Sequence, residues 1–329
     1  MTVTELAPAK INLTLDILGK RGDGFHQIEM VMQSVGVYDT VRIWRLSTLE
    51  ADELWETAGA DSVIFSSGAG GKILLRLTMD ISDLPCDKTN LAWRAAQLFY
   101  EHYGNRIDEE GEYPLGSHGC RAIAIDIAKR IPMAAGLAGG SADAAGVLRG
   151  LRKLHDVDIQ ISELADTAGE LGSDIPFCVI GGTALVTGRG EILESLSAMH
   201  PCYVVLAKPP ADISTPWAYR KFDEFAEKMP DFQRPDTKGL IDCLGKGGDL
   251  EDILGFLVNV FENVTRPACP RGKKYKQLMM ENGALAALMS GSGPTVFGIV
   301  GDAASAERLA TAMQEKTEGQ IAFGPVLGT

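Results

Sequence analysis

A glycine-rich stretch in the middle of the chain has the residue types of an anion-binding turn. Residues 132–148 read PMAAGLAGGSADAAGVL, in which Gly136, Gly139 and Gly140 precede Ser141. Isoleucine at every second position of residues 122–128 predicts a strand before it, and the alanine- and leucine-rich residues after it predict a helix to about residue 155, capped by Ser141 or Asp143. Unpaired N–H groups at a helix start attract anions, and glycines let the backbone approach a ligand.

This stretch alone does not define a phosphate site. It is not the P-loop pattern G-x-x-x-x-G-K-[ST], because no lysine follows Gly140, and it is not the dinucleotide pattern G-x-G-x-x-G. A glycine turn before a helix is as often a plain connection as a phosphate cradle. The hypothesis of phosphoryl transfer therefore needs further groups elsewhere in the chain.

Candidate groups of that kind occur in three other stretches. Lys10 and Asn12 lie on the polar face at the start of a half-buried strand predicted for residues 5–18. Asp174 follows a predicted short helix, where its carboxylate either acts as a base or only caps the next helix. A second glycine turn, SGSGP at residues 290–294, joins two predicted strands. A cation, a carboxylate and two anion-friendly turns are thus present.

The remaining pattern predicts an α+β protein of two domains. A chain of 329 residues exceeds the usual size of one core, and an apolar strand at residues 202–207 marks the start of the second domain, so we divide the chain into residues 1–198 and 199–329. Residues 104–119 read as a surface loop, and residues 229–249 and 265–272 as connections. The other predicted strands are 29–35, 40–44, 286–289 and 295–300, with a hairpin at 181–191; the predicted helices begin at 91 and span 162–171, 216–228, 250–263, 273–282 and 304–316.

Composition excludes several classes of partner. A net charge of −13 argues against a nucleic-acid or acidic membrane surface, and no apolar run approaches the roughly 18 residues that a membrane span needs. The six cysteines are scattered without a C-x-x-C pair, and the histidines show no H-x-x-x-H spacing, which argues against structural zinc. We expect reduced thiols, a cytoplasmic location and a small-molecule partner; the choice between monomer and homodimer stays open.

Three separated blocks together resemble the motifs of the GHMP kinases. They are PAKINL at residues 8–13, the turn at 132–145 and MSGSGP at 289–294. RGDGFH at 21–26, GSDIP at 172–176 and TGRGE at 187–191 narrow the resemblance to the branch that phosphorylates the 2-hydroxyl of 4-diphosphocytidyl-2-C-methyl-D-erythritol in non-mevalonate isoprenoid biosynthesis. The resemblance spans nearly the whole chain except 104–119 and parts of 228–275. It implies an ATP-dependent kinase with a ribosomal protein S5 domain 2-like N-terminal domain and a ferredoxin-like C-terminal domain, the site lying between them.

The resemblance also implies roles for the phosphate-handling residues. Asp174 would accept the hydroxyl proton, and Lys10 would keep that carboxylate ionised and offset charge at the transferring group. Aspartate is a weak base, but in a loose transfer positioning matters more than basicity. Ala138 stands where many relatives have glycine, so we expect its φ not to be positive, and Ala142 replaces a frequent second serine. The residues expected at the ATP phosphates are Pro132, Gly136, Leu137, Gly139, Gly140, Ser141, Gly291, Ser292 and Gly293, with Ser141 also near Mg²⁺.

For the acceptor, the resemblance places Phe25 and His26 at cytosine, the first stacking on the base and the second hydrogen-bonding its polar edge. Tyr219 would cover the opposite face, and Asn12 is also assigned to the substrate. Two alternatives remain: a GHMP kinase for another small alcohol of the homoserine or mevalonate type, and a non-enzymatic ligand sensor of the same fold. The aromatic residues argue against the first, because acyclic substrates offer nothing to stack, and the intact Lys10, Asp174 and glycines argue against the second.

Overall fold

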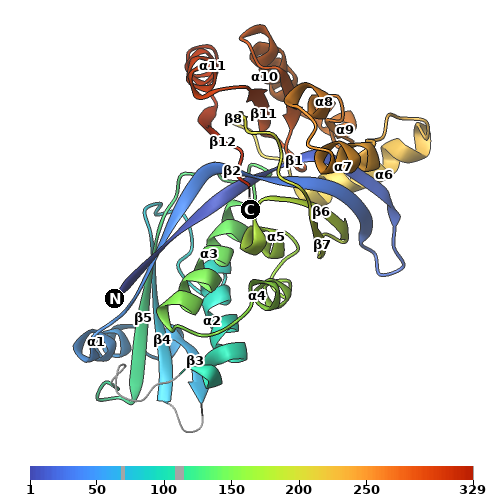
Figure 1. The fold of residues 1–329 in the computed structure, drawn as a ribbon. Coiled ribbons are helices and arrows are strands. Elements are labelled where there is room, and N and C mark those ends of the chain that lie inside the picture. Colours follow the sequence, from blue (N-terminus) through green and yellow to red (C-terminus); the bar gives the residue numbers. More distant parts are fainter. Residues whose placement is uncertain (68–70, 108–114, 329) are drawn as a thin grey trace. The chain divides into compact units, whose positions relative to one another are not determined.

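The computed structural model describes residues 1–67, 71–107 and 115–328 (Figure 1). The chain forms two compact units, each built from separate segments. The first unit comprises Met1–Ala7, Tyr38–Arg130 and Gly140–Ile180, and the second comprises Pro8–Val37, Ile131–Gly139 and Gly181–Thr329. No helix within the described residues is long and apolar enough to cross a membrane. The predicted loop at 104–119 falls in part on residues 108–114, which lie outside the described residues.

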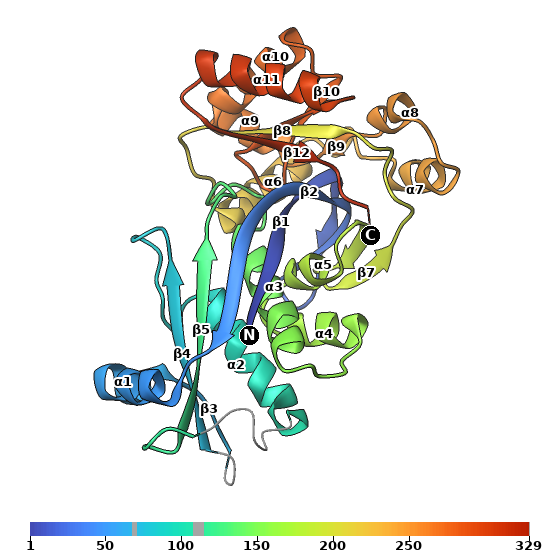
Figure 2. The same cartoon turned by 60° about the vertical axis from the view of Figure 1, so that its left-hand side comes forward.

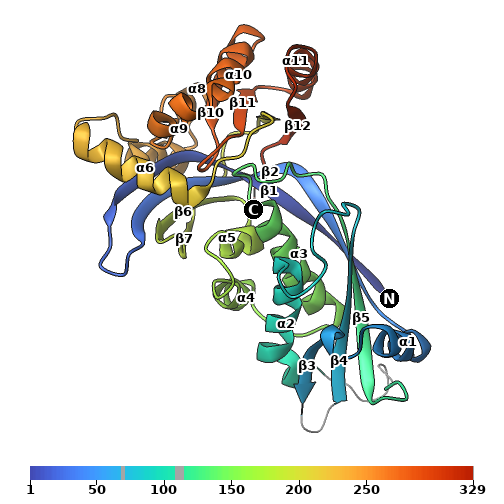
Figure 3. The ribbon, with the colours of Figure 1, turned by 180° about the vertical axis from the view of Figure 1, so that it is seen from behind.

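The first unit is a sheet with helices on both faces. Its strands are β3 (Val63–Ser67), β4 (Gly71–Met79), β5 (Cys120–Ala128) and the end of β2 (His26–Arg45). β4 and β5 run parallel, and the other pairs are antiparallel. α1 (Thr48–Ala58) covers one face, while α2 (Leu91–Tyr103) and α3 (Gly139–Leu154) lie on the other (Figure 3). The unit also contains α4 (Ile161–Ala168) and α5 (Ile175–Ile180).

Alternation along the strands decides which residues meet which helix. On β2, Val41 and Ile43 face α3, where Gly146 and Gly150 allow close approach: a Cβ on Gly150 would lie 2.6 Å from Ile43 Cδ1. Ala122 and Ala124 of β5 point to the opposite face and pack in the cluster with Ala51 of α1. Because side chains alternate with a period of two, one strand serves both faces. The predicted strand at 122–128 is confirmed.

The second unit contains the hairpin formed by β1 (Thr2–Lys20), from Pro8 onward, and the first part of β2. Within this unit β1 also pairs in parallel with the two-residue strand β9 (Val258–Asn259). β2 pairs with β6 (Thr183–Gly188), which continues to β7 (Ile192–Ser195), both antiparallel. The predicted strand at 5–18 and the predicted hairpin at 181–191 are therefore confirmed. Because β9 pairs with β1 at the edge of the sheet, residues 258–259 lie beside the strand that carries the first motif.

A second, antiparallel sheet in this unit follows the ferredoxin-like pattern. Its order is β10 (Ala286–Met289), β11 (Val296–Val300), β8 (Tyr203–Lys208) and β12 (Gln320–Pro325). In chain order this is a strand, helices, two strands, a helix and a strand, with the first strand between the third and fourth. α10 (Pro270–Glu281) and α11 (Ala303–Lys316) pack on one face through Tyr275, Met279, Leu309 and Met313 (Figure 2). The predicted α+β class is confirmed.

Several predicted elements differ from the structure. The two strands predicted at 29–35 and 40–44 are one strand, β2. The helix predicted at 250–263 is wrong: α8 (Leu250–Leu254) ends at Gly255, and β9 intervenes before α9 (Glu262–Ala268). The predicted connections contain α7 (Thr237–Gly245), part of α9 and the start of α10, and β12 was not predicted. Residues 258–259 become a strand because β1 offers them a partner, which local sequence does not reveal. α6 (Thr215–Lys228) agrees with its prediction.

The backbones of β12 and β2 approach each other closely at Gly324 and Gly36. Leu327 N donates to Ser34 O at 2.9 Å, and a Cβ on Gly324 would lie only 2.3 Å from Gly36 O. Gly324→Ala must therefore displace β12 from β2, and we expect the free energy of unfolding to fall by about 1–3 kcal/mol. The control is Gly301→Ala, whose Cβ would meet nothing within 4 Å. Equal urea midpoints for the two variants would contradict the close approach.

Candidate active site

The first glycine turn is held between the first motif and the second glycine turn. Lys10 N donates to Leu137 O at 3.1 Å, and Ser290 Oγ donates to Gly136 O at 2.9 Å. Gly136 has a φ of +72°, and a Cβ there would lie 2.4 Å from Ser290 O. Both its backbone conformation and its surroundings require glycine. The buried Pro132 precedes the turn, and Gly139 is the first residue of α3.

The turn contains two alanines in the left-handed region. Ala138 has a φ of +57° and Ala134 a φ of +49°. The expectation that Ala138 avoids a positive φ is therefore wrong. A left-handed conformation costs a residue with a Cβ roughly 1–2 kcal/mol, and it persists here because the hydrogen bonds to Leu137 and Gly136 fix the two residues that precede Ala138.

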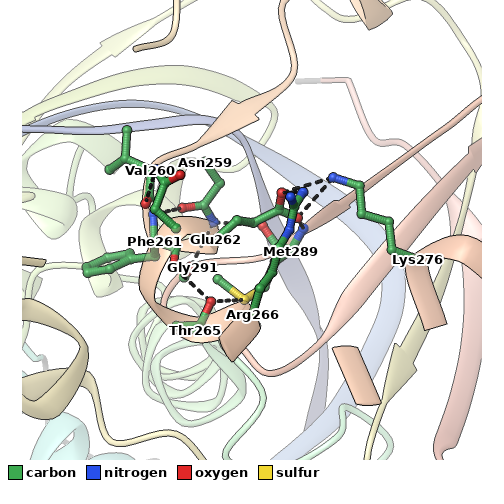
Figure 4. A network of polar contacts seen from close by, with 10 residues as sticks. Asn259, Val260, Phe261, Glu262, Thr265, Arg266, Lys276, Met289 and Gly291 are labelled. Carbon is green, nitrogen blue, oxygen red and sulfur yellow. Dashed lines mark hydrogen bonds and ion pairs between the residues drawn. The ribbon is translucent and has the colours of Figure 1, made fainter. Parts of the chain in front are cut away.

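The second glycine turn is anchored by Asn259, a residue that the sequence did not mark. Asn259 Nδ2 donates to Met289 O and to Gly291 O, both at 2.8 Å (Figure 4). Gly293 N donates to Ser290 O at 3.0 Å, and Ser292 Oγ shares a hydrogen bond of 2.9 Å with Thr215 Oγ1. Asn259 was missed because its position depends on β9 pairing with β1, whereas the sequence pattern there predicted a helix.

Lys10 lies in the second unit beside both turns. A Cβ built on Gly291 would be 3.6 Å from Lys10 Nζ and 3.2 Å from Gly136 O. Lys10 and Asn12 are both buried, with 4% and 0% of their surface exposed, and Lys10 Nζ donates to Asn12 Oδ1 at 2.8 Å. Asn12 Nδ2 in turn contacts Met30 Sδ at 3.1 Å. Lys10 thus places a buried ammonium group beside both glycine turns.

The residues expected at cytosine fall into two groups. Phe25 is 56% exposed, and the Arg189 guanidinium lies 5.1 Å from the centre of its ring. His26 and Tyr219 stack on one another with ring centres 4.6 Å apart. The His26 Nε2 is 2.7 Å from Asp223 Oδ1 on α6. Asp223 thus orients the imidazole, a contact that sequence reasoning did not identify.

The remaining expected residues belong to the first unit. α3 begins at Gly139, so Ser141 and Asp143 lie within the helix, and the prediction that either caps it is wrong. Gly140 is exposed and Ser141 is partly exposed in the first turn. Asp174 immediately precedes α5, and its carbonyl oxygen accepts from Cys178 N at 3.1 Å. Its main chain therefore starts α5, while the role of its carboxylate stays a prediction.

A buried cluster of charged side chains connects the residues that precede the first glycine turn in sequence to those that follow it. The Lys129 ammonium, before the turn, contacts the carboxylates of Asp143, after it, and Asp39 of β2. Asp143 Oδ1 is buried and has no hydrogen-bond partner within residues 1–67, 71–107 and 115–328. Burial raises the pKa of the Asp143 carboxyl to about 7; Lys129 opposes this rise and Asp39 adds to it. The ion pair fixes the start of α3 to the end of β5.

In the part of the chain that the structure describes, no group of three or more histidine, cysteine, aspartate or glutamate side chains is arranged to hold a metal ion. The cysteines described are all free thiols. The Ser141 hydroxyl, which is expected near Mg²⁺, lies in the first turn of α3, and its role as a ligand stays a prediction.

Comparison with known proteins gives consistent matches. Two family models match, GHMP kinases N terminal domain at residues 90–182 and GHMP kinases C terminal at residues 222–319. The chain is 39% identical over 309 residues to the 4-diphosphocytidyl-2-C-methyl-D-erythritol kinase of Listeria monocytogenes serotype 4a, covering 94% of this chain and 91% of the relative. It is 39% identical over 300 residues to the kinase of the same name from Bacillus pumilus, covering 91% and 89%. A crystal structure of 4-(cytidine 5'-diphospho)-2C-methyl-D-erythritol kinase matches with a TM-score of 0.72 and 27% identity, covering 99% of this chain and 100% of that one.

The Asp143 cluster predicts how stability depends on pH. Unfolded aspartate has a pKa near 3.8, whereas folded Asp143 keeps its proton up to about pH 7. The folded state thus binds more protons in between, so this group's contribution to stability is present at low pH and is lost as pH rises through 7. From about pH 5 to about pH 8 we expect the free energy of unfolding of Asp143→Asn to gain at least about 1 kcal/mol relative to wild type.

Urea unfolding at the two pH values measures this difference. The exposed Asp166→Asn on α4 is the matched control and should track wild type at both. A parallel pH dependence for wild type and Asp143→Asn would contradict the raised pKa.

Proposed function

We propose a function from the premise that this chain belongs to the GHMP kinases, in the branch of the 4-diphosphocytidyl-2-C-methyl-D-erythritol kinases. The chain transfers the γ-phosphate of ATP to the 2-hydroxyl of 4-diphosphocytidyl-2-C-methyl-D-erythritol, a step of non-mevalonate isoprenoid biosynthesis. One observation of the structure carries the proposal: both glycine turns meet beside the buried Lys10 ammonium. A buried cation next to two turns with positive φ suits the phosphates of a nucleotide.

The residues proposed to bind ATP come from the two glycine turns and from the start of α3. Backbone N–H groups of the turns donate to phosphate oxygens, and Lys10 supplies a fixed positive charge for the group in transfer. The hydrogen bonds from Asn259 and Ser290 hold the turns in place before ATP binds, so binding costs little conformational entropy of the turns. The proposed set is Pro132, Gly136, Leu137, Gly139, Gly140, Ser141, Gly291, Ser292 and Gly293.

Mg²⁺ is the proposed second cofactor, and Ser141 the residue that holds it. Mg²⁺ prefers oxygen ligands and is bound with waters, substrate phosphates and one or two protein groups, and the Ser141 hydroxyl is a suitable oxygen in the first turn of α3. When bound, Mg²⁺ neutralises charge on the β- and γ-phosphates.

The proposed chemistry assigns the proton to Asp174. The 2-hydroxyl oxygen forms a bond to the γ-phosphorus, the bond from that phosphorus to the bridging oxygen breaks, and ADP leaves with the electron pair. The hydroxyl proton passes to the Asp174 carboxylate. Lys10 stabilises the negative charge that moves through the transferring group, and Asn12 holds the Lys10 ammonium in place.

The proposed cytosine site combines Phe25, His26 and Tyr219. Phe25 is exposed enough to stack on a base. The contact between His26 Nε2 and Asp223 leaves Nδ1 facing away from that carboxylate, and Nδ1 is the proposed acceptor for the exocyclic amino group of cytosine. Tyr219 is proposed to cover the opposite face of the base, and its stack on His26 fixes the plane of the imidazole. Homoserine and mevalonate offer no base for this set, and a ligand sensor would not need the carboxylate of Asp174.

We also propose that the family's two domains divide this chain at residues 198 and 199. The matches at 90–182 and 222–319 fall on either side of that boundary.

A kinase assay with three acceptors tests the function. With ATP and Mg²⁺ we expect phosphorylation of the cytidyl substrate but not of homoserine or mevalonate. Asp174→Ala should lower kcat by about a thousandfold or more while ATP and the cytidyl substrate still bind in calorimetry. Asp166→Ala, on the exposed side of α4, should keep wild-type kcat. A rate for Asp174→Ala within about tenfold of wild type would remove it as the base.

The stacking role of Phe25 gives a separate prediction. Phe25→Ala should raise the KM for the cytidyl substrate by about tenfold, since stacking on a base is worth roughly 1–3 kcal/mol, and leave the KM for ATP unchanged. Phe25→Tyr keeps the ring and should retain the wild-type KM. Steady-state kinetics that give the same cytidyl KM for Phe25→Ala and wild type would discard the stacking assignment.

A further inference from the structure

A partly open pocket in the second unit lies beside the second glycine turn. Met289 and Pro294, which flank that turn, form part of its wall, and Ile213 and Val296 extend the apolar surface. The residues proposed above for ATP, the acceptor and catalysis are not among those that line it. The pocket is therefore a separate feature whose purpose the proposed reaction does not explain.

The charges at this pocket are mostly positive. Arg266 of α9 and Lys273 and Lys276 of α10 line it, and Glu262 is the carboxylate among them, which leaves a formal charge of +2. The whole chain carries −13, so this local excess runs against the protein's overall charge. An apolar wall with cations beside it complements a small molecule that has a dianionic head group and an apolar body.

Glu262 connects these cations to the glycine turn. Its buried carboxylate accepts from Lys276 Nζ at 2.9 and 3.1 Å, from Arg266, and from Met289 N at 3.1 Å (Figure 4). Asn259 holds the carbonyl oxygen of the same Met289. An anion that draws Arg266 or Lys276 away from Glu262 weakens the electrostatic support of the carboxylate that fixes the start of the turn.

We propose that this pocket binds a small organic phosphate, a phosphomonoester with a short apolar chain, and that its occupation alters ATP binding through Glu262 and Met289. The dianionic charge of a phosphomonoester near neutral pH matches the +2 of the lining, and Arg266 suits its oxygens. The second half of the proposal rests on the proposed function of the second glycine turn, whereas the first half does not.

Calorimetry with n-butyl phosphate tests the binding. We expect saturable binding that persists when a non-hydrolysable ATP analogue is present. Inorganic phosphate lacks the apolar chain and n-butanol lacks the phosphate, so each should bind about tenfold more weakly. Lys273→Gln should weaken n-butyl phosphate about tenfold. Lys273 is exposed, so its variant should fold, and the exposed neighbour Lys274→Gln, which does not line the pocket, should bind as wild type.

Two results would overturn the site. One is no saturable binding up to about 10 mM n-butyl phosphate; the other is binding that the ATP analogue displaces and Lys273→Gln does not affect. Because binding is first measured without ATP or acceptor, it can fail while the kinase assay succeeds, and the reverse.

The coupling is tested by kinetics with n-butyl phosphate present. We expect the KM for ATP to rise at least about fivefold in wild type and to stay unchanged in Lys273→Gln, whose basal kinetics should equal those of wild type. An unchanged KM for ATP in wild type with the pocket filled would overturn the coupling.

Discussion

The second unit depends on the close approach of two backbone turns that are far apart in the sequence. Gly136 and Ser290 are in direct contact, and no side chain larger than a hydrogen fits at Gly136. This approach leaves room beside the turns for the ammonium of Lys10. A cation held there by the fold, rather than recruited by a ligand, needs no reorganisation when a polyanion binds, which is the condition for strong electrostatic stabilisation.

Residues outside the motifs maintain this arrangement. Asn259 and Glu262, from β9 and the start of α9, hold Met289 through its carbonyl oxygen and its N–H. Within the first unit, Lys129 joins Asp39 to Asp143 and so fixes the start of α3. Both clusters place charge inside the protein, where an unpaired group is costly. Lys129 contacts both aspartates, and Glu262 contacts both Arg266 and Lys276, so each cluster brings opposite charges together.

The positive φ of Ala138 shows that hydrogen bonds to the turn outweigh the preference of alanine for a negative φ. An alanine would ordinarily avoid a φ of +57°. The turn nevertheless adopts this conformation because the residues beside it are hydrogen-bonded to Lys10 and Ser290. The position of residue 138 therefore tolerates a Cβ. Position 136 does not, because the neighbouring carbonyl oxygen leaves no space for one.

By itself, the sequence determined the α+β class, the strand of the first motif, both glycine turns and the family, because these depend on short periodicities and on motifs read in order. Residue types and the family resemblance marked Lys10, Asn12 and the glycines as candidate site residues, and these roles stay predictions. Only the tertiary structure decided that residues 258–259 form a strand, that Asn259, Asp223 and Glu262 support the sites, that Ser141 and Asp143 lie inside α3, and that Ala138 adopts a positive φ. The strand at 258–259, the contacts of these three side chains and the conformation of Ala138 are set by partners distant in the chain, and local propensity carries no information about such partners.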